Sequence, residues 1–287
     1  MRTRRLLVLI VAAMASMTLI TPAAASAATE YGSTNKWPWS GYWWPMLENN
    51  YNLYSDNGPL QKYDTQFGTG AKAWERQNHY TNDAANKWWG HCHAWASAAI
   101  LAPEPKATGN YTINDTKGLT TALYYEPTFQ WLSGVRVDDV NDRSSAAYQD
   151  IAPAWMDYLL RYYVQEHGSS FVMDTDPGSP VWNFPVAGFE RSTSKNGDGS
   201  VRVKTDVWFR KPTAGVAGYD PNSFFRKTYE YDLWNTADGR GSTGRWVSDD
   251  RPDFAWASDG HKATDGQTQR NPKLDPKIVE EILGYAI

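Results

Sequence analysis

The chain has 287 residues, 28 of them basic and 32 acidic, which gives a formal net charge of −4. The charges are scattered without a basic stripe, so nucleic acid and anionic lipid are not expected partners. The length is ample for a hydrophobic core, and we expect residues 28–287 to form a single domain.

The first 27 residues have the three parts of an export signal. Arg2, Arg4 and Arg5 form a basic segment, residues 6–20 are a largely apolar run, and residues 25–27 are the small-residue sequence Ala-Ser-Ala. The run is shorter than the roughly 20 residues that a membrane span needs. We therefore predict a signal peptide over 1–27 and a secreted, extracellular mature chain without a membrane segment. Cleavage leaves 25 basic and 32 acidic residues, a formal charge of −7.

Aromatic residues and breakers dominate the start of the mature chain. Residues 31–46 mix paired tryptophans with prolines and a glycine, which predicts a segment that drapes over the core without regular structure. Residues 54–63 are rich in turn formers, and residues 68–86 are polar and partly helical by pattern.

Cys92 is the one cysteine of the chain, so no internal disulfide is possible. Gly90 precedes it, and residues 94–100 are small, apolar and helix-favouring, which places Cys92 in the first turn of a buried helix. Free N–H groups and the helix dipole there lower a thiol pKa from about 8.5 and hold an oxyanion. This arrangement is typical of papain-like and transglutaminase-like enzymes, and Cys92 is the predicted nucleophile. The alternative is a small buried core residue.

Two histidines flank the cysteine. His91 and His93 are neighbours of Cys92 in a predicted helix, where adjacent side chains point roughly 100° apart. They do not converge on one ion, and no second cysteine completes a zinc set. We therefore predict no metal site at this motif.

The second half of the chain changes from helical to strand patterns. We predict helices over residues 116–125 and 152–167, the latter with Trp155, Tyr162 and Tyr163 in the core. The alternating strand 201–209 follows a turn at 196–199, and strand 228–234 pairs with 244–247 across 237–239. Asp275 caps a closing helix. The predicted fold is α+β, a papain/transglutaminase-like core whose nucleophile-bearing helix packs on a mainly antiparallel sheet.

The fifteen tryptophans and seventeen tyrosines predict a large rigid core, and some of these rings are expected to line a cleft. Trp89 and Trp95 beside Cys92, and Trp182 further along, are the candidate substrate-binding rings.

Three segments carry a family resemblance. They are Gly-His-Cys-His-Ala-Trp-Ala at 90–96, Ser-Phe-Val-Met-Asp at 170–174 and Val-Trp-Asn-Phe-Pro-Val-Ala-Gly-Phe at 181–189. With them the chain resembles the elicitor-type transglutaminase family, known from oomycete cell-wall glycoproteins and bacterial relatives. The resemblance implies a calcium-assisted aminoacyltransferase: Cys92 forms a thioester with a glutamine of a protein or peptide substrate, and an amine donor resolves it. It also implies Asp174 as the catalytic acid.

The base is not defined by the motifs. His261 is the candidate, since it follows Pro252-Asp253-Phe254 and lies near Asp249, Asp250 and Asp259; the alternative is a solvated loop residue. His167 is separated from Asp174 by roughly 20 Å of extended chain. Arg251 stands where a family histidine would precede the Pro-Asp-Phe run.

Two other functions are therefore kept open. One is a papain-like amidase or peptidase acting on cell-wall peptides, and the other is a catalytically impaired extracellular binding protein. Calcium ligands are not defined either. Oxygen donors cluster at residues 56–58, 174–176 and 196–198, but none of the three has the spacing of an EF-hand loop.

Overall fold

The computed structural model describes residues 28–47, 51–136, 150–235, 241, 243–261 and 269–287. The predicted signal peptide lies outside the described residues. Within the described ranges, none of the helices has the length and apolar character needed to cross a membrane.

The α-helices are α1 (Pro59–Phe67), α2 (Ala71–Asn78), α3 (Cys92–Leu101), α4 (Ile113–Leu123), α5 (Pro153–Leu159) and α6 (Pro276–Leu283). The other helical segments are the 3-10 helices η1 (Ala84–Asn86) and η3 (Pro221–Ser223) and the π-helix η2 (Leu160–Glu166). The strands are β1 (Ala28–Ser33), β2 (Pro127–Gly134), β3 (Val172–Met173), β4 (Phe184–Lys195), β5 (Val201–Arg210), β6 (Phe224–Trp234), β7 (Thr243–Trp246) and β8 (Phe254–His261).

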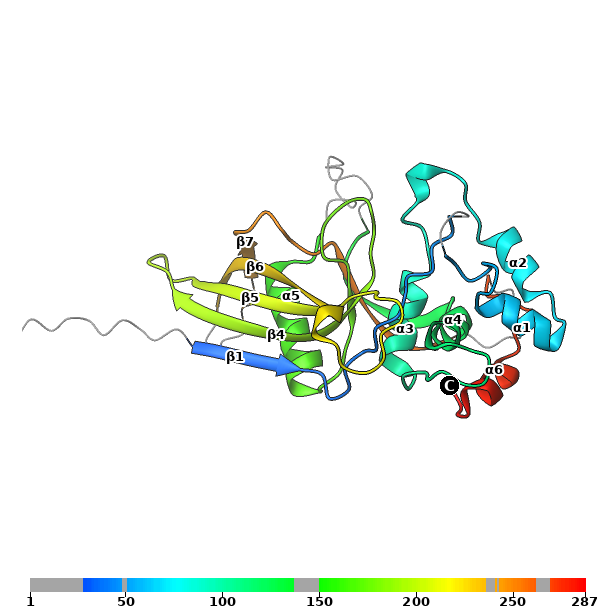
Figure 1. Ribbon diagram of the computed structural model, residues 1–287. Coiled ribbons are helices and arrows are strands. Elements are labelled where there is room, and N and C mark those ends of the chain that lie inside the picture. Colours follow the sequence, from blue (N-terminus) through cyan, green and yellow to red (C-terminus); the bar gives the residue numbers. More distant parts are fainter. Residues whose placement is uncertain (1–27, 48–50, 137–149, 236–240, 242, 262–268) are drawn as a thin grey trace, which may run out of the picture.

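The strands form one antiparallel sheet in the order β2-β8-β3-β4-β5-β6-β7, with β1 also paired to β4. β4 takes two neighbours along one edge, because its first residues pair with the short β3 and its later residues with β1. Figure 1 shows the sheet at one end of the molecule, α1, α2, α4 and α6 at the other, and α3 between them.

The sheet core follows from strand alternation. Val203, Thr205, Val207 and Phe209 of β5 are buried, and the apolar members of this set pack in one cluster with side chains of α5 and η2. A second cluster joins α1, α3, α4 and α6.

Small residues let α3 fit between the two halves. Seven of its ten residues are buried. Its Ala96 packs with Val172 of β3 and Trp256 of β8, and α3 also contacts α4, β2 and β4. The predicted α+β class, with the cysteine-bearing helix on an antiparallel sheet, is confirmed.

Two local predictions are wrong. Tyr31, Gly32 and Ser33 are not irregular but belong to β1, because pairing with β4 satisfies their backbone whatever the side-chain pattern. Trp155 is 43% exposed and stacks on Tyr158 outside the core. The aliphatic side chains of α5 and η2, Met156, Leu159, Leu160 and Val164, take the core face instead, and the tyrosines of η2 are only partly buried.

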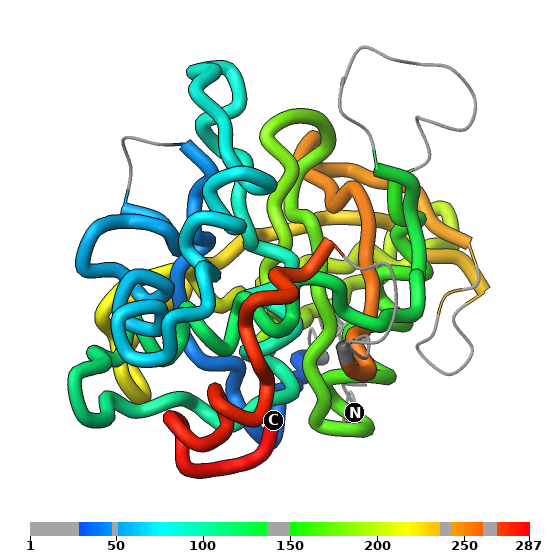
Figure 2. Tube along the Cα trace, turned by 90° about the vertical axis from the view of Figure 1, so that its right-hand side faces the viewer, coloured from blue at the N-terminus to red at the C-terminus, as the bar shows by residue number. Residues whose placement is uncertain are grey.

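The closing helix forms as predicted, and Asp275 Oδ1 caps it by accepting from Lys277 N at 2.9 Å. Figure 2 looks onto the helical end, where the red C-terminal segment lies beside the blue and cyan α1 and α2. Asn271 just before α6 is buried and donates to the carbonyl of Ala71 at the start of α2. The predicted pairing of residues 228–234 with 244–247 is present as β6–β7, and the turn that joins them lies outside the described residues.

Gly90 is required where the chain enters α3. It bridges to Pro45, and a Cβ at this position would lie 2.6 Å from the Trp43 carbonyl oxygen and 2.9 Å from that of Trp44. Both are backbone atoms and do not move away cheaply. The segment that drapes over the core thus touches the turn that positions Cys92.

We expect Gly90→Ala to lower the free energy of unfolding by about 1–3 kcal/mol, the usual cost of forcing an extra group into a packed site. Urea denaturation followed by tryptophan fluorescence measures it. Gly197→Ala is the control, because a Cβ there meets nothing within 4 Å. Equal stability of the two variants would contradict the assignment of Gly90 as a packing-restricted position.

Candidate active site

The Cys92 side chain lies at the start of α3 and is 7% exposed. Its sulfur accepts a hydrogen bond from Asn183 Nδ2 at 3.4 Å. Asn183 directly precedes β4, and its Oδ1 accepts from Trp256 Nε1 of β8 at 2.8 Å. The ring of Trp256 therefore fixes the orientation of the amide, so that its N–H₂ end faces the sulfur.

Burial and hydrogen bonding have opposite effects on the pKa of the Cys92 thiol. Burial raises the pKa of Cys92, while N–H groups of Asn183 and the backbone N–H of His93 lower it and the charge of Asp174 raises it. Burial is the largest effect, and the pKa is raised overall. The expectation of a thiolate stabilised by the helix start alone is therefore wrong, because the sulfur at the helix start is itself buried.

Asp174 follows β3 and is buried, 1% exposed. Its Oδ2 accepts from the backbone N–H of Trp182 at 3.1 Å, and the carboxyl group of Asp253 lies close enough to act on it electrostatically. Burial, with the neighbouring Asp253 charge, raises the pKa of Asp174 well above its ordinary value. Asp174 thus bonds the backbone just before Asn183, and its negative charge raises the pKa of Cys92.

The two flanking histidines diverge, as their positions in the sequence predict. His91 Nδ1 lies 2.9 Å from the Trp44 carbonyl oxygen, and His93 Nε2 lies 2.8 Å from that of Tyr125. Burial lowers the pKa of His93 to about 4, so that its ring is neutral near pH 7.

The candidate bases lie away from the sulfur or outside the described side chains. His261 is the last residue of β8, opposite Pro127. It comes five residues after Trp256, about 17 Å along an extended strand, and its side chain is outside the described part. His167 is exposed and its Nδ1 bonds the Tyr162 carbonyl. Arg251 forms an ion pair with Asp150.

The three predicted substrate rings have different surroundings. Trp89 is 44% exposed and lines a cavity with Cys92. Trp95 is 0% exposed and its Nε1 donates to the Trp39 carbonyl. It is a core residue with no surface for a substrate, because it lies on the inner face of α3. Trp182 is partly buried and packs on Trp43 and Phe184.

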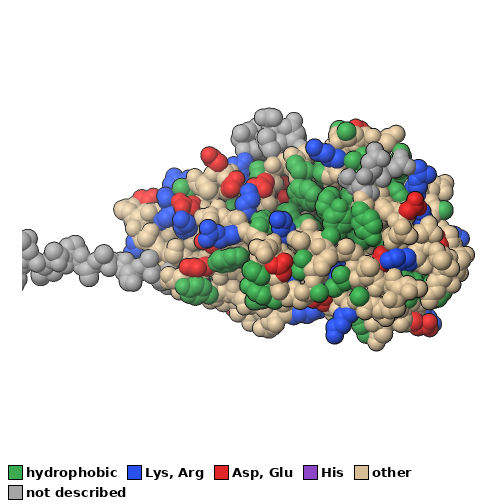
Figure 3. Space-filling view, viewed as in Figure 1, with side chains coloured by type: hydrophobic (Ala, Val, Ile, Leu, Met, Phe, Trp, Pro, Cys, Tyr) green, Lys and Arg blue, Asp and Glu red, His purple; other side chains and the backbone are tan. Residues whose placement is uncertain are grey.

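Two adjoining cavities open beside the cysteine. The smaller, of 250 Å³, is lined by Cys92, Trp89 and Asn183 among others. The larger, of 400 Å³, shares His93, Asn183, Arg136 and Val181 with it and continues past aromatic side chains: Tyr125, Phe129, Trp131, Phe254 and Trp256. We call the two together the aromatic cleft. Figure 3 shows hydrophobic side chains gathered where the sheet meets the helical half.

The three oxygen clusters from the sequence do not fit a calcium site. Asp56 pairs with Lys72 at 2.6 Å, and Asp176 pairs with Lys227 at 2.5 Å. Asn196 and Asp198 hydrogen-bond within their own turn. Because several of these oxygens already have cationic or hydrogen-bonding partners, no chemical step through calcium is derived from them.

The sequence patterns did not predict Asn183, which bonds the sulfur, or Trp256, which holds Asn183. Asn183 lies inside the 181–189 motif, beside the predicted substrate ring Trp182, and Trp256 closes the 252–256 segment. A buried amide next to a nucleophile could have been suspected from the motif. Its pairing with Trp256, 73 residues later, could not.

A buried helix that starts at a cysteine, packs on an antiparallel sheet and opens into an aromatic cleft defines a transglutaminase-like fold. The family model described as "Transglutaminase elicitor" matches residues 68–210. Among solved structures, the chain is similar to the crystal structure of the GP42 transglutaminase from Phytophthora sojae, with a TM-score of 0.69 and 21% identity over 88% of this chain and 90% of that chain. No curated protein matches. The chain belongs to the transglutaminase elicitor family.

We expect the native thiol to react slowly with iodoacetamide at pH 7, more slowly than free cysteine, since the sulfur is buried and its pKa is raised. The rate should rise with pH beyond the ordinary range of a thiol. In Asn183→Ala the midpoint should move further up, because an N–H donor that lowers the pKa is lost. Mass spectrometry of labelled protein in a chelating buffer, which protects the thiol from oxidation, measures both profiles.

The denatured protein is the control and should follow the profile of a free cysteine. A native midpoint below that of the denatured protein would contradict the dominance of burial over the N–H groups.

Proposed function

We propose that the chain is a secreted thiol acyltransferase, a protein-glutamine gamma-glutamyltransferase-like enzyme that acts through a Cys92 thioester. The observation that carries the proposal is the Asn183 amide aimed at the Cys92 sulfur at the mouth of the aromatic cleft. Membership of the transglutaminase elicitor family supports the reaction class.

The chemistry begins with loss of the thiol proton to a base. The sulfur then attacks the carboxamide carbon of a substrate glutamine, and the negative charge moves to the oxygen. The Asn183 Nδ2–H and the backbone N–H of His93 are the donors available for that oxygen. The C–N bond breaks, ammonia leaves with the proton, and a thioester remains. A primary amine attacks the thioester, forms an amide bond and releases Cys92.

The aromatic cleft supports a protein or peptide substrate. Phe129 is 53% exposed and Trp131 is 45% exposed, and both line the larger cavity. Exposed rings of this kind bury apolar side chains and stack on extended peptides. Trp89 on the other side of Cys92 lines the smaller cavity. A chain that crosses the cleft passes the sulfur, so that a glutamine reaches it.

His261 and Asp174 are proposed as the base and the acid. For His261 this role requires the end of β8 to come closer to the sulfur than its position five residues beyond Trp256. His261 ends β8, the strand whose Trp256 holds Asn183, and Asp174 acts on the sulfur electrostatically. Calcium is proposed on family resemblance alone. Hydrolysis of the thioester would make the same site an amidase, and a site without a working base would make it a binding protein.

The first test is incorporation of a fluorescent primary amine into a glutamine-rich protein by the purified protein, with and without Ca²⁺. We expect labelling by the wild type and its loss, by more than about 1,000-fold, in Cys92→Ser, because the thiol provides the covalent intermediate.

The measurement separates the three functions. Ammonia release without amine incorporation means hydrolysis, and peptide cleavage means a peptidase. Either result would overturn the acyl transfer. Turnover equal in Cys92→Ser and wild type would remove the cysteine from the mechanism, whereas binding of the substrate protein without turnover would leave a binding protein.

The base has its own test in the pH dependence of turnover. We expect His261→Gln to lower kcat by about 10²–10⁴-fold, the usual contribution of a general base, with little change in KM. His167→Gln is the matched control, since this histidine is exposed and bonded to its own helix end. If His261→Gln keeps the wild-type rate and pH profile, His261 is not the base.

A further inference from the structure

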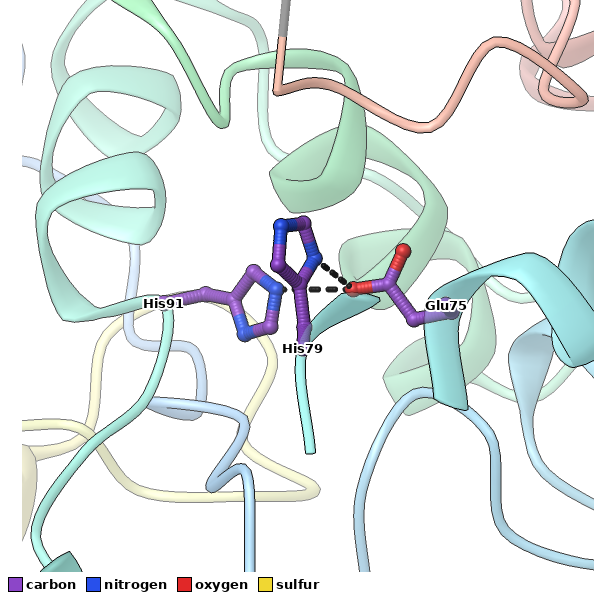
Figure 4. A group of neighbouring side chains, drawn as sticks. All are labelled: Glu75, His79 and His91. Atoms are coloured by element: carbon purple, nitrogen blue, oxygen red, sulfur yellow. Dashed lines mark hydrogen bonds and ion pairs between the residues drawn. The ribbon is translucent and has the colours of Figure 1, made fainter. Parts of the chain in front are cut away.

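A cluster outside the proposed chemistry lies behind the start of α3. Glu75 lies on α2, His79 directly follows that helix four residues later, and His91 directly precedes α3. Glu75 Oε1 lies 2.7 Å from His79 Nδ1 and 2.9 Å from His91 Nε2. The three residues are buried, with 1%, 6% and 2% exposure. Figure 4 shows the two rings and the carboxylate converging on one point.

The ring of His91 has acceptors on both sides. Its Nδ1 lies 2.9 Å from the Trp44 carbonyl oxygen, and because a carbonyl only accepts, this nitrogen carries the hydrogen. In a neutral ring Nε2 then has a free lone pair, and that lone pair faces the Glu75 carboxylate. Two acceptors at this distance need a positively charged occupant between them.

The hydrogen bonds that His91 and Glu75 make to their other neighbours are of the kind that support metal ligands. A ligating histidine usually gives its other N–H to a carbonyl or carboxylate, as His91 does to Trp44. A ligating carboxylate is usually hydrogen-bonded in turn, and Glu75 Oε2 accepts from Asn271 Nδ2 at 3.0 Å. Tyr125 stacks on the His79 ring with 4.1 Å between the ring centroids, and Trp74 meets the same ring edge to face at 5.4 Å. The rings shield the cluster from water.

We propose that Glu75, His79 and His91 bind a divalent transition-metal ion of the zinc class. The donor atoms of the three residues lie within 4.8 Å of one another. Two imidazoles and one carboxylate suit zinc, whereas calcium takes oxygen ligands. Zinc bonds of about 2.0–2.2 Å require donors about 3.3 Å apart in a tetrahedron, so the donors separate by a few tenths of an ångström on binding.

The ion ties two parts of the fold together. It joins α2 to the residue before Cys92, and through Asn271 it reaches the segment before α6. Three protein ligands leave one position for water. A ligand that binds only the folded chain stabilises it by mass action, so the ion strengthens the positioning of the nucleophile helix. The site needs no turnover at Cys92, and its test is independent of the acyl transfer.

The sequence carried a signal for it. Glu75 and His79 have the i, i+4 spacing that places two ligands on one helix face. In the sequence, His91 stands beside Cys92 and His93, which cannot share an ion with it, and for that reason no metal site is predicted at the motif.

The test is titration of the chelator-treated full-length protein with Zn²⁺ against a chromophoric competitor, and with Co²⁺ followed by its visible absorption. We expect one ion per chain and, for bound Co²⁺, the visible absorption bands of a four-coordinate site rather than those of hydrated Co²⁺. His79→Gln should weaken Zn²⁺ binding by about 100-fold or more, and His167→Gln should bind as the wild type does. Asn271→Ala, which keeps the ligands in place, should weaken binding by about 10–100-fold.

The competing occupant of the cluster is a proton shared by His91 and Glu75. Absence of Zn²⁺ uptake by the wild type at micromolar concentration, or equal uptake by His79→Gln, would establish that occupant and overturn the proposal. Circular dichroism and thermal unfolding of each variant show whether it is folded. If His79→Gln does not fold, the wild-type cobalt spectrum and Asn271→Ala decide the question.

Discussion

The structure around Cys92 depends on one contact, the seating of residues 43–45 against residues 90–91. The backbone N–H of His91 donates to the Trp43 carbonyl at 2.6 Å, and the His91 ring bonds the next carbonyl, that of Trp44. The approach is close enough that only glycine fits at position 90. An irregular segment thereby fixes the residue before α3, and with it the position and direction of the cysteine.

Burial explains most of the chemistry that surrounds the sulfur. It raises the pKa values of Cys92 and Asp174 together, and N–H groups oppose it at both. A thiol in such a site is unreactive until a base or a substrate changes its environment. The Asn183 amide, held by Trp256, is a fixed dipole that does not need to reorient when charge develops. Under the proposed function, a desolvated and preorganised site of this kind would react with a bound substrate in preference to dissolved electrophiles.

The motifs of the sequence identified the right segments more often than the right side chains. The 90–96 segment gave the helix start, and the 181–189 motif gave the loop that meets it. Within that loop Trp182 packs on Trp43 and Phe184, while its neighbour Asn183 contacts the sulfur. Trp95 lies in the same motif as Cys92 and is a predicted substrate ring, but it faces the core. Periodicity specifies that a residue is on a helix, but the face that meets the cleft depends on what packs on the other faces.

The sequence by itself determined the α+β class, the helix that begins at Cys92, the antiparallel strands of the second half and the family. Those features follow from local spacing, capping residues and short motifs, which act over a few residues. Only the tertiary structure decided that Asn183, held by Trp256, meets the sulfur, that burial outweighs the helix start in setting the thiol pKa, and that His91 faces Glu75 and His79. These contacts join residues 12 to 91 positions apart, and no local pattern specifies which distant side chains share one buried volume.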